Sequence, residues 1–212
     1  MVKPTRKESA LPNKRIAILI SGRGSNMVAL SEAIASGRVP GAEIVLVLSD
    51  KASAPGLETA RERGHDTVVV ERQGRKREEH EAEIIDALKQ RHADLICLAG
   101  YMRVLSSSFI QEFPRRILNI HPSLLPSFPG LNVHQQAITH GVKWTGCTVH
   151  FVDDTLDGGP IIAQRTVAIL DDDTEESLAE RILEQEHRLY AEALALVVSE
   201  KFEVVGRRVL KR

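Results

Sequence analysis

Short apolar runs rich in β-branched residues alternate with longer polar stretches through the first 120 residues. Continuous apolar runs bounded by turn residues are typical of strands buried on both faces, as in parallel sheets. The stretches between them are long enough for the helices that cover such a sheet. The sequence therefore predicts a doubly wound α/β fold with a mostly parallel sheet. The expected strands are 15–21, 43–49, 67–71, 94–99 and 116–120, and the expected helices are 26–36, 54–63 and 76–91.

The pattern changes in the second half of the chain. Two longer strands, 145–152 and 161–170, flank an Asp/Gly-rich turn, and we expect them to extend the sheet in mixed orientation. A long helix is predicted over 174–199, N-capped by its first threonine, and 202–209 is predicted as a last edge strand.

No repeat or long linker interrupts this pattern, so we expect a single domain over 15–212. The polar, basic segment Met1–Lys14 has no apolar core of a signal peptide and is predicted to be a disordered extension.

Composition narrows the class of partner. A net charge of −1 and 4% aromatic residues argue against a nucleic-acid-binding surface. No apolar run approaches the roughly 20 residues of a membrane span. Cys97 and Cys147 lack metal-ligand spacing, so no metal site is expected. They are predicted to be buried free thiols in a reducing compartment, which favours the cytoplasm. The expected partners are small molecules, with the chain as a monomer or homodimer.

The segment Ser21–Asn26 (SGRGSN) closes the first expected strand and opens a helix. Its glycines allow close backbone approach, and a helix N-terminus offers free N–H groups to an anion. The segment is too short for a dinucleotide fingerprint, so a single phosphate monoester is the expected ligand. The alternative is a tight strand–helix turn without a ligand.

Asn119 and His121 lie two residues apart at the end of an apolar run that stops at Pro122. Alternate residues of a strand share a face, so the amide and the imidazole should point the same way. The prolines at 122, 126 and 129 should stiffen the loop that follows. A hydrogen-bond donor beside a titratable ring suits acyl-type transfer. A buried strand end with satisfied polar groups is the alternative.

An acidic turn, Asp153–Pro160, separates the two late strands. Its carboxylates are either solvated turn residues or part of a site. One sheet can bring Asp157 beside His121 although 36 positions separate them. A carboxylate there favours the protonated imidazole, which would complete a cluster of oxyanion donor, proton-transfer group and electrostatic partner. His150, on a neighbouring strand, is either a supporting residue or a core histidine.

Together these groups resemble the phosphoribosylglycinamide formyltransferases, folate-dependent enzymes of purine synthesis also called GAR transformylases. The resemblance covers about residues 15–190 and is most specific in ILISGRGSN, LAGYMRVLS, ILNIHPSLLPSFPGL and GCTVHFVDDTLDGGPIIAQ. It implies a Rossmann-like formyltransferase fold. It also implies formyl transfer from 10-formyltetrahydrofolate, as cosubstrate, to the primary amine of glycinamide ribonucleotide (GAR).

The resemblance implies roles residue by residue. Asn119, His121 and Asp157 match the catalytic residues, with direct attack by the amine and no metal. Two further sets match substrate-binding positions. The ribonucleotide set is Gly24, Ser25, Asn26 and Glu186, and the folate set is Arg77, Met102, Arg103, Val104, Leu105, Asn119, Asp153, Asp154, Thr155, Leu156 and Asp157.

Arg23 and Tyr101 depart from residues frequent in the family, asparagine and phenylalanine, outside the catalytic trio. Two other formyl-folate enzymes, the deformylating hydrolase and methionyl-tRNA formyltransferase, are the nearest rivals. Each of these enzymes would normally carry an additional domain. We expect neither additional domain in this chain, so both enzymes are disfavoured. A non-catalytic nucleotide-phosphate binding module is the remaining alternative.

Overall fold

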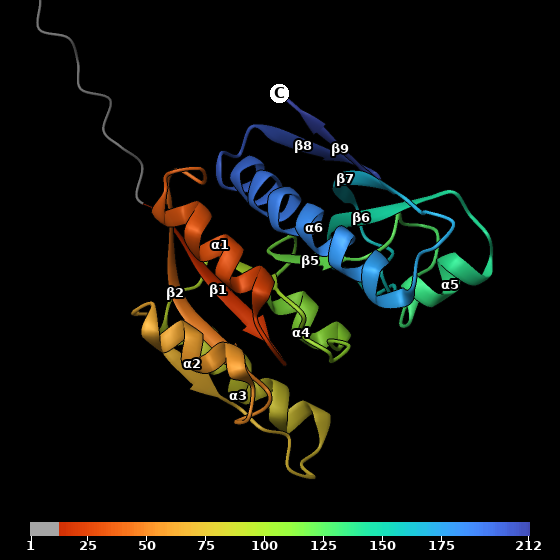
Figure 1. The fold of residues 1–212 in the computed structure, drawn as a ribbon. Coiled ribbons are helices and arrows are strands. Elements are labelled where there is room, and N and C mark those ends of the chain that lie inside the picture. The colour runs from red at the N-terminus through yellow and green to blue at the C-terminus, as the bar shows by residue number, and fades with distance from the viewer. Residues whose placement is uncertain (1–12) are drawn as a thin grey trace, which may run out of the picture.

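A computed structural model describes residues 13–212 of the chain. Nine strands form one sheet in the order β3-β2-β1-β4-β5-β6-β7-β9-β8 (Figure 1). The strands are β1 (Lys14–Ile20), β2 (Ala42–Ser49), β3 (Thr67–Val69), β4 (Leu95–Leu98), β5 (Ile117–His121), β6 (Trp144–Phe151), β7 (Ile161–Ala168), β8 (Phe202–Val205) and β9 (Arg208–Lys211). The helices are α1 (Ser25–Ala35), α2 (Pro55–Glu62), α3 (Arg77–Gln90), α4 (Ser107–Glu112), α5 (Val133–Thr139) and α6 (Glu175–Val198).

The first five strands are parallel, as predicted. Alternate residues of β1 enter different cores: Ile16, Ile18 and Ile20 belong to one cluster, and Ala17 and Leu19 to the other. The first cluster also contains apolar residues of α1, α2 and α6, and the second those of α3 and α4. Burial on both faces is why these strands are apolar without alternation. The predicted doubly wound fold is confirmed.

The late strands extend the sheet in mixed orientation, as predicted, and β7 pairs with β9 in parallel orientation. β5 pairs with β6, and β6 pairs with β7, in antiparallel orientation. The expectation of one edge strand over 202–209 is wrong, because the chain turns at Val205–Arg208 to form the antiparallel hairpin β8–β9. Gly206, at φ +60°, lies in this turn, where a glycine adopts the left-handed conformation without strain.

Two short helices were not expected from the sequence. α4 has six residues and α5 seven, too few for a clear helical repeat. The predicted β3 ends at Val69 rather than Glu71, and β1 begins at Lys14 rather than Arg15. The rest of the predicted extension, residues 1–12, lies outside the described residues.

The order of the strands determines where in the fold a ligand site is expected. The chain leaves β1 toward β2 and β3 on one side, and returns to β4 and β5 on the other (Figure 1). Ligands of doubly wound folds bind at the carboxyl ends of the strands beside this reversal. The glycine loop follows β1 there, and Asn119 and His121 lie at the same edge, at the end of β5. Among residues 13–212, no helix is long and apolar enough to cross a membrane.

Candidate active site

The end of β5 presents its amide and imidazole beside β6. Asn119 is opposite His150 in the antiparallel register, and His121 is opposite Thr148. Asn119 is half-buried, whereas His121 is 5% exposed and therefore in contact with protein on nearly every side. The ladder thus brings a second histidine to the amide that the sequence had singled out.

The ring of His121 is held from both nitrogens. Nε2 lies 2.9 Å from the carbonyl oxygen of Phe128, and Nδ1 lies 3.5 Å from Oδ2 of Asp157. A carbonyl oxygen only accepts, so Nε2 carries a proton in this arrangement. The carboxylate of Asp157 thus faces the second ring nitrogen. The prediction that Asp157 lies beside His121 is confirmed.

His150 fixes the orientation of Asn119. Nδ1 of His150 donates to the Phe151 carbonyl oxygen at 2.9 Å, and burial lowers the pKa of the ring. A neutral ring with its proton on Nδ1 has an acceptor at Nε2, which lies 3.2 Å from Nδ2 of Asn119. The amide therefore donates one of its two hydrogens to His150. Of the two readings of His150, the structure favours a supporting residue.

Asp157 joins the acidic turn to the proline-rich loop. Its Oδ2 accepts the Gly130 N–H at 2.9 Å, and its Oδ1 lies 3.8 Å from Nε2 of His150. The side chain is 11% exposed. Its backbone has φ +49°, a conformation that aspartate and asparagine tolerate better than most residues. The carboxylate is thus a fixed acceptor between two histidines.

The loop after β5 is held by hydrogen bonds that the sequence did not reveal. The Thr148 hydroxyl donates to the Ser123 carbonyl at 2.7 Å and accepts the Leu125 N–H at 3.0 Å. Gln164 donates to the Leu125 carbonyl at 2.8 Å. Both side chains come from strands more than 20 positions away, so prolines are only part of what orders this loop.

The glycine loop has the geometry expected of an anion site. Gly24 has φ +76°, and α1 begins at Ser25 with its free N–H groups directed outward at this end. A Cβ at Gly24 would lie 3.0 Å from Cα of Gly56, so α2 closes the loop from behind. Asn26, in the first turn of α1, donates from Nδ2 to Oε2 of Glu186 at 2.7 Å.

Glu186 is 7% exposed, and burial raises the pKa of its carboxyl group. The hydrogen bond from Asn26 opposes that shift. Oδ1 of Asn26 is buried and has no hydrogen-bond partner among residues 13–212. A carboxyl group and an orphan amide oxygen therefore stand together beside the glycine loop, as polar groups suited to bind hydroxyl or amine donors.

The predicted folate segment 102–105 lies after β4. Met102 and Val104 are 66% and 65% exposed, whereas Leu105 is buried in the core beside α3 and α4. Arg77 donates to the Val104 carbonyl at 2.6 Å. A cavity of about 240 Å³ opens beside this segment, lined by Arg72, Arg77, His80, Glu81, Tyr101, Met102, Arg103 and Val104.

The remaining predicted folate residues lie in the acidic turn. Asp153 accepts the Thr155 N–H at 2.9 Å, which shapes the turn. Asp154 and Leu156 are exposed, the latter by 61%. The structure thus brings this turn to the end of β5 through Asp157, while Asp154, Thr155 and Leu156 are exposed.

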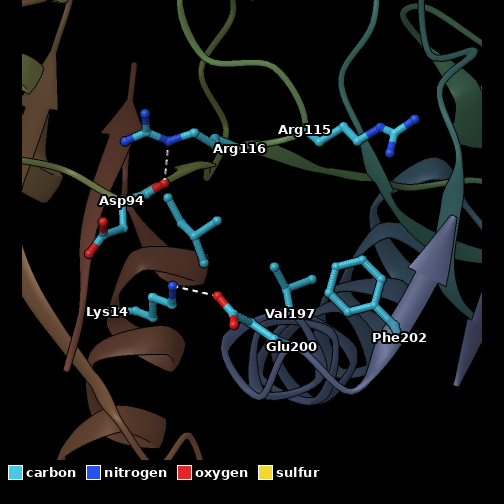
Figure 2. Close-up of a pocket in the computed structure, with 8 residues that line it drawn as sticks. Lys14, Asp94, Arg115, Arg116, Val197, Glu200 and Phe202 are labelled. Atoms are coloured by element: carbon cyan, nitrogen blue, oxygen red, sulfur yellow. Dashed lines mark hydrogen bonds and ion pairs between the residues drawn. The ribbon is translucent and has the colours of Figure 1, made fainter. Parts of the chain in front are cut away.

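A larger cavity, about 330 Å³, lies at the opposite edge of the sheet (Figure 2). Lys14 and Leu95, which line it, stand at the amino ends of their strands. Lys14 Nζ lies 2.5 Å from Oε1 of Glu200, and Arg116 donates to the backbone carbonyl of Asp94 at 2.7 Å. None of the clustered histidine, amide and carboxylate groups lines this cavity.

Residues 14–194 match the family model described as formyl transferase. Phosphoribosylglycinamide formyltransferase of Escherichia coli K12 is 42% identical over 176 residues, which cover 82% of this chain and 82% of that protein. The crystal structure of glycinamide ribonucleotide transformylase 1 from Symbiobacterium toebii is 46% identical, covers 94% of both chains and superimposes with a TM-score of 0.91.

The trifunctional purine biosynthetic protein adenosine-3 of Drosophila melanogaster is 47% identical over 197 residues. These cover 92% of this chain but 15% of the length of that relative. The chain therefore corresponds to one part of a much longer multifunctional protein there.

Proposed function

Because the chain belongs to the formyl transferase family, we propose that it transfers the formyl group of 10-formyltetrahydrofolate to the primary amine of glycinamide ribonucleotide. The products are formyl-GAR and tetrahydrofolate. The observation that carries the proposal is the cluster of Asn119, His121 and Asp157 at the carboxyl edge of the sheet that also bears the glycine loop. The whole of residues 15–212 would form one formyltransferase domain in the cytoplasm.

The amine of GAR would attack the formyl carbon directly and form a C–N bond. The carbonyl electron pair moves to oxygen, giving a tetrahedral oxyanion. Nε2–H of His121 and the second N–H of Asn119 would donate to it. The Phe128 carbonyl oxygen now occupies the acceptor position 2.9 Å from Nε2, and the oxyanion would replace it. A proton then passes from the attacking nitrogen to N10, and the C–N10 bond breaks.

The two substrates would approach Asn119 and His121 from opposite sides. Gly24, Ser25 and Asn26 would hold the ribonucleotide phosphate at the N-terminus of α1, and Glu186 would accept the ribose hydroxyls. The folate would lie along Met102–Leu105, whose backbone would bind the edge of the pterin ring. Arg77 and the residues of the acidic turn, Asp153, Asp154, Thr155 and Leu156, would complete the folate site.

The direct test mixes the purified protein with 10-formyltetrahydrofolate and GAR and follows deformylated folate together with formyl-GAR. Equal amounts of the two products, formed only when GAR is present, are expected. Folate release without GAR would instead make the protein a hydrolase. Absence of both products would indicate that the protein is a non-catalytic binding module that uses only the glycine loop.

Glu186→Gln should stabilise the fold while weakening GAR binding. Burial raises the carboxyl pKa above its ordinary value of 4.5, so the native state holds this proton more tightly than the unfolded chain. The contribution of Glu186 to stability is therefore full below pH 4.5 and is lost as pH rises through the raised folded value. At pH 7 the buried carboxylate is a cost that a neutral glutamine removes.

We expect the variant to gain about 1 kcal/mol at pH 7, roughly 2–4 °C in Tm for a chain of this size. The KM for GAR should rise about tenfold, since a charged hydrogen-bond acceptor is lost. Thermal unfolding at pH 7 and at pH 4 measures the first effect, and the gain should shrink at the lower pH. A Tm that falls equally at both pH values would contradict this assignment.

A further inference from the structure

Asp50 is a buried carboxylate that the proposed reaction does not use. It follows β2 directly, and its side chain is 2% exposed. Oδ1 accepts the Ser21 hydroxyl at 2.6 Å, and Oδ2 accepts Nε–H of Arg103 at 2.6 Å. Buried carboxylates are costly unless donors surround them, so both contacts are needed to keep this one in place.

The same carboxylate reaches the folate segment by two routes. Arg103 connects to it directly through the guanidinium group. Met102 connects through Ser21, whose hydroxyl accepts the Met102 N–H at 2.9 Å while donating to Asp50. Asp50 therefore fixes the backbone at one residue of the segment and the side chain of the next.

Ser21 also belongs to the other substrate site. It ends the apolar run of β1, its N–H donates to the Gly100 carbonyl at 3.1 Å, and Gly22 follows it. The carbonyl of Gly22 accepts the Gly56 N–H at 3.1 Å. The ends of β1, β2 and β4 thus meet at Asp50, between the glycine loop and the folate segment.

Burial of its own side chain does little to order Met102, at the near end of the folate segment, because that side chain is 66% exposed. The far end of the segment has a separate anchor: Glu81 accepts the Ser106 N–H at 2.9 Å, and Arg77 donates to the Val104 carbonyl at 2.6 Å. Loss of the Asp50 contacts would therefore release the near end alone.

We propose that Asp50 is a positioning residue that holds Met102 and Arg103 at a fixed place relative to the glycine loop. The inference rests on the proposed function, in which this backbone binds the pterin ring. Asp50 touches neither substrate; it acts through Ser21 and Arg103.

The test compares Asp50→Asn, Arg103→Gln and the double variant. An asparagine that keeps its oxygen toward the Ser21 hydroxyl presents its N–H₂ group to Arg103, so the Arg103 contact is lost. We expect each single variant to raise the KM for 10-formyltetrahydrofolate about tenfold, and the KM for GAR less than about twofold. The double variant should be no worse than the single variants, because both changes break the same contact.

Glu43→Gln is the matched control. Glu43 lies near the opposite end of β2 and pairs with Arg15 at 2.9 Å. Its loss should leave the KM for folate unchanged. A merely structural Asp50 would lower Tm and the active fraction, and hence kcat, with both KM values unchanged. That result, or additive effects of Asp50→Asn and Arg103→Gln, would overturn the proposal.

Equilibrium binding of tetrahydrofolate separates this inference from the proposed reaction. If the wild-type protein binds tetrahydrofolate but forms no formyl-GAR, the proposed reaction fails, while tenfold weaker binding by Asp50→Asn still supports the positioning role. Equal affinity of the two proteins overturns it. Where Asp50→Asn does not fold, Ser21→Ala removes the hydroxyl that links Asp50 to the Met102 N–H and should also weaken tetrahydrofolate binding.

Discussion

His121→Ala should lower kcat about a thousandfold, the usual range for loss of a group that moves protons in the transition state. The KM for GAR should change little, because the glycine loop and Glu186 lie on other elements, α1 and α6. The ring is held by Phe128 and Asp157 in one orientation, and an alanine provides no hydrogen-bond donor there. Steady-state kinetics with both substrates varied gives kcat and each KM.

His92→Asn is a suitable control for that variant. His92 is exposed, follows α3 at the distant end of β4, and has φ +46°, which asparagine tolerates. Its kcat should equal that of the wild type. A His121→Ala enzyme with near-normal turnover would remove the ring from the mechanism, whatever the KM values.

Asp157→Asn should lower kcat about a hundredfold while GAR still binds. The substitution keeps the shape of the side chain, and the positive φ of this position suits asparagine. The Asn oxygen can still accept the Gly130 N–H. What disappears is the negative charge beside His121, 3.5 Å from its Nδ1. Electrostatics therefore accounts for the expected loss, rather than a change of shape.

The measurement is kcat for Asp157→Asn beside Asp171→Asn, which changes a carboxylate 96% exposed and paired with Lys143 on the surface. The exposed control should lose nothing. Retained turnover in Asp157→Asn would show that the charge is not needed. If the affinity for GAR fell as well, the acidic turn would belong to ribonucleotide binding rather than to proton transfer.

Much of the site could be predicted from local patterns in the sequence. Asn119 and His121 share a face because alternate strand residues must do so, and the glycine loop is a contiguous segment. The sequence leaves the contacts of His150 open, because the strand pattern shows to which side of the sheet this side chain points but not which residue it contacts. Register against β5 supplies that partner, Asn119, at 3.2 Å.

Other groups of the candidate site have no local signal in the sequence. Asp50 stands in an ordinary strand–loop junction, 53 positions from Arg103, and nothing in its neighbourhood marks it as a partner. Thr148 and Gln164 look like strand residues until the loop after β5 lies across them. The short α4 and α5 and the β8–β9 hairpin were missed because each has too few residues for a clear period.

The doubly wound fold, the glycine loop and the polar strand end could be predicted from the sequence, because the periodicity of buried residues and the conformations of glycine and proline are local properties. Only the tertiary structure decided which distant groups meet: Asp157 with His121, Asn26 with Glu186 across 160 positions, and Asp50 with Arg103. Those contacts follow from strand order and register, which depend on how the whole sheet packs between its helices.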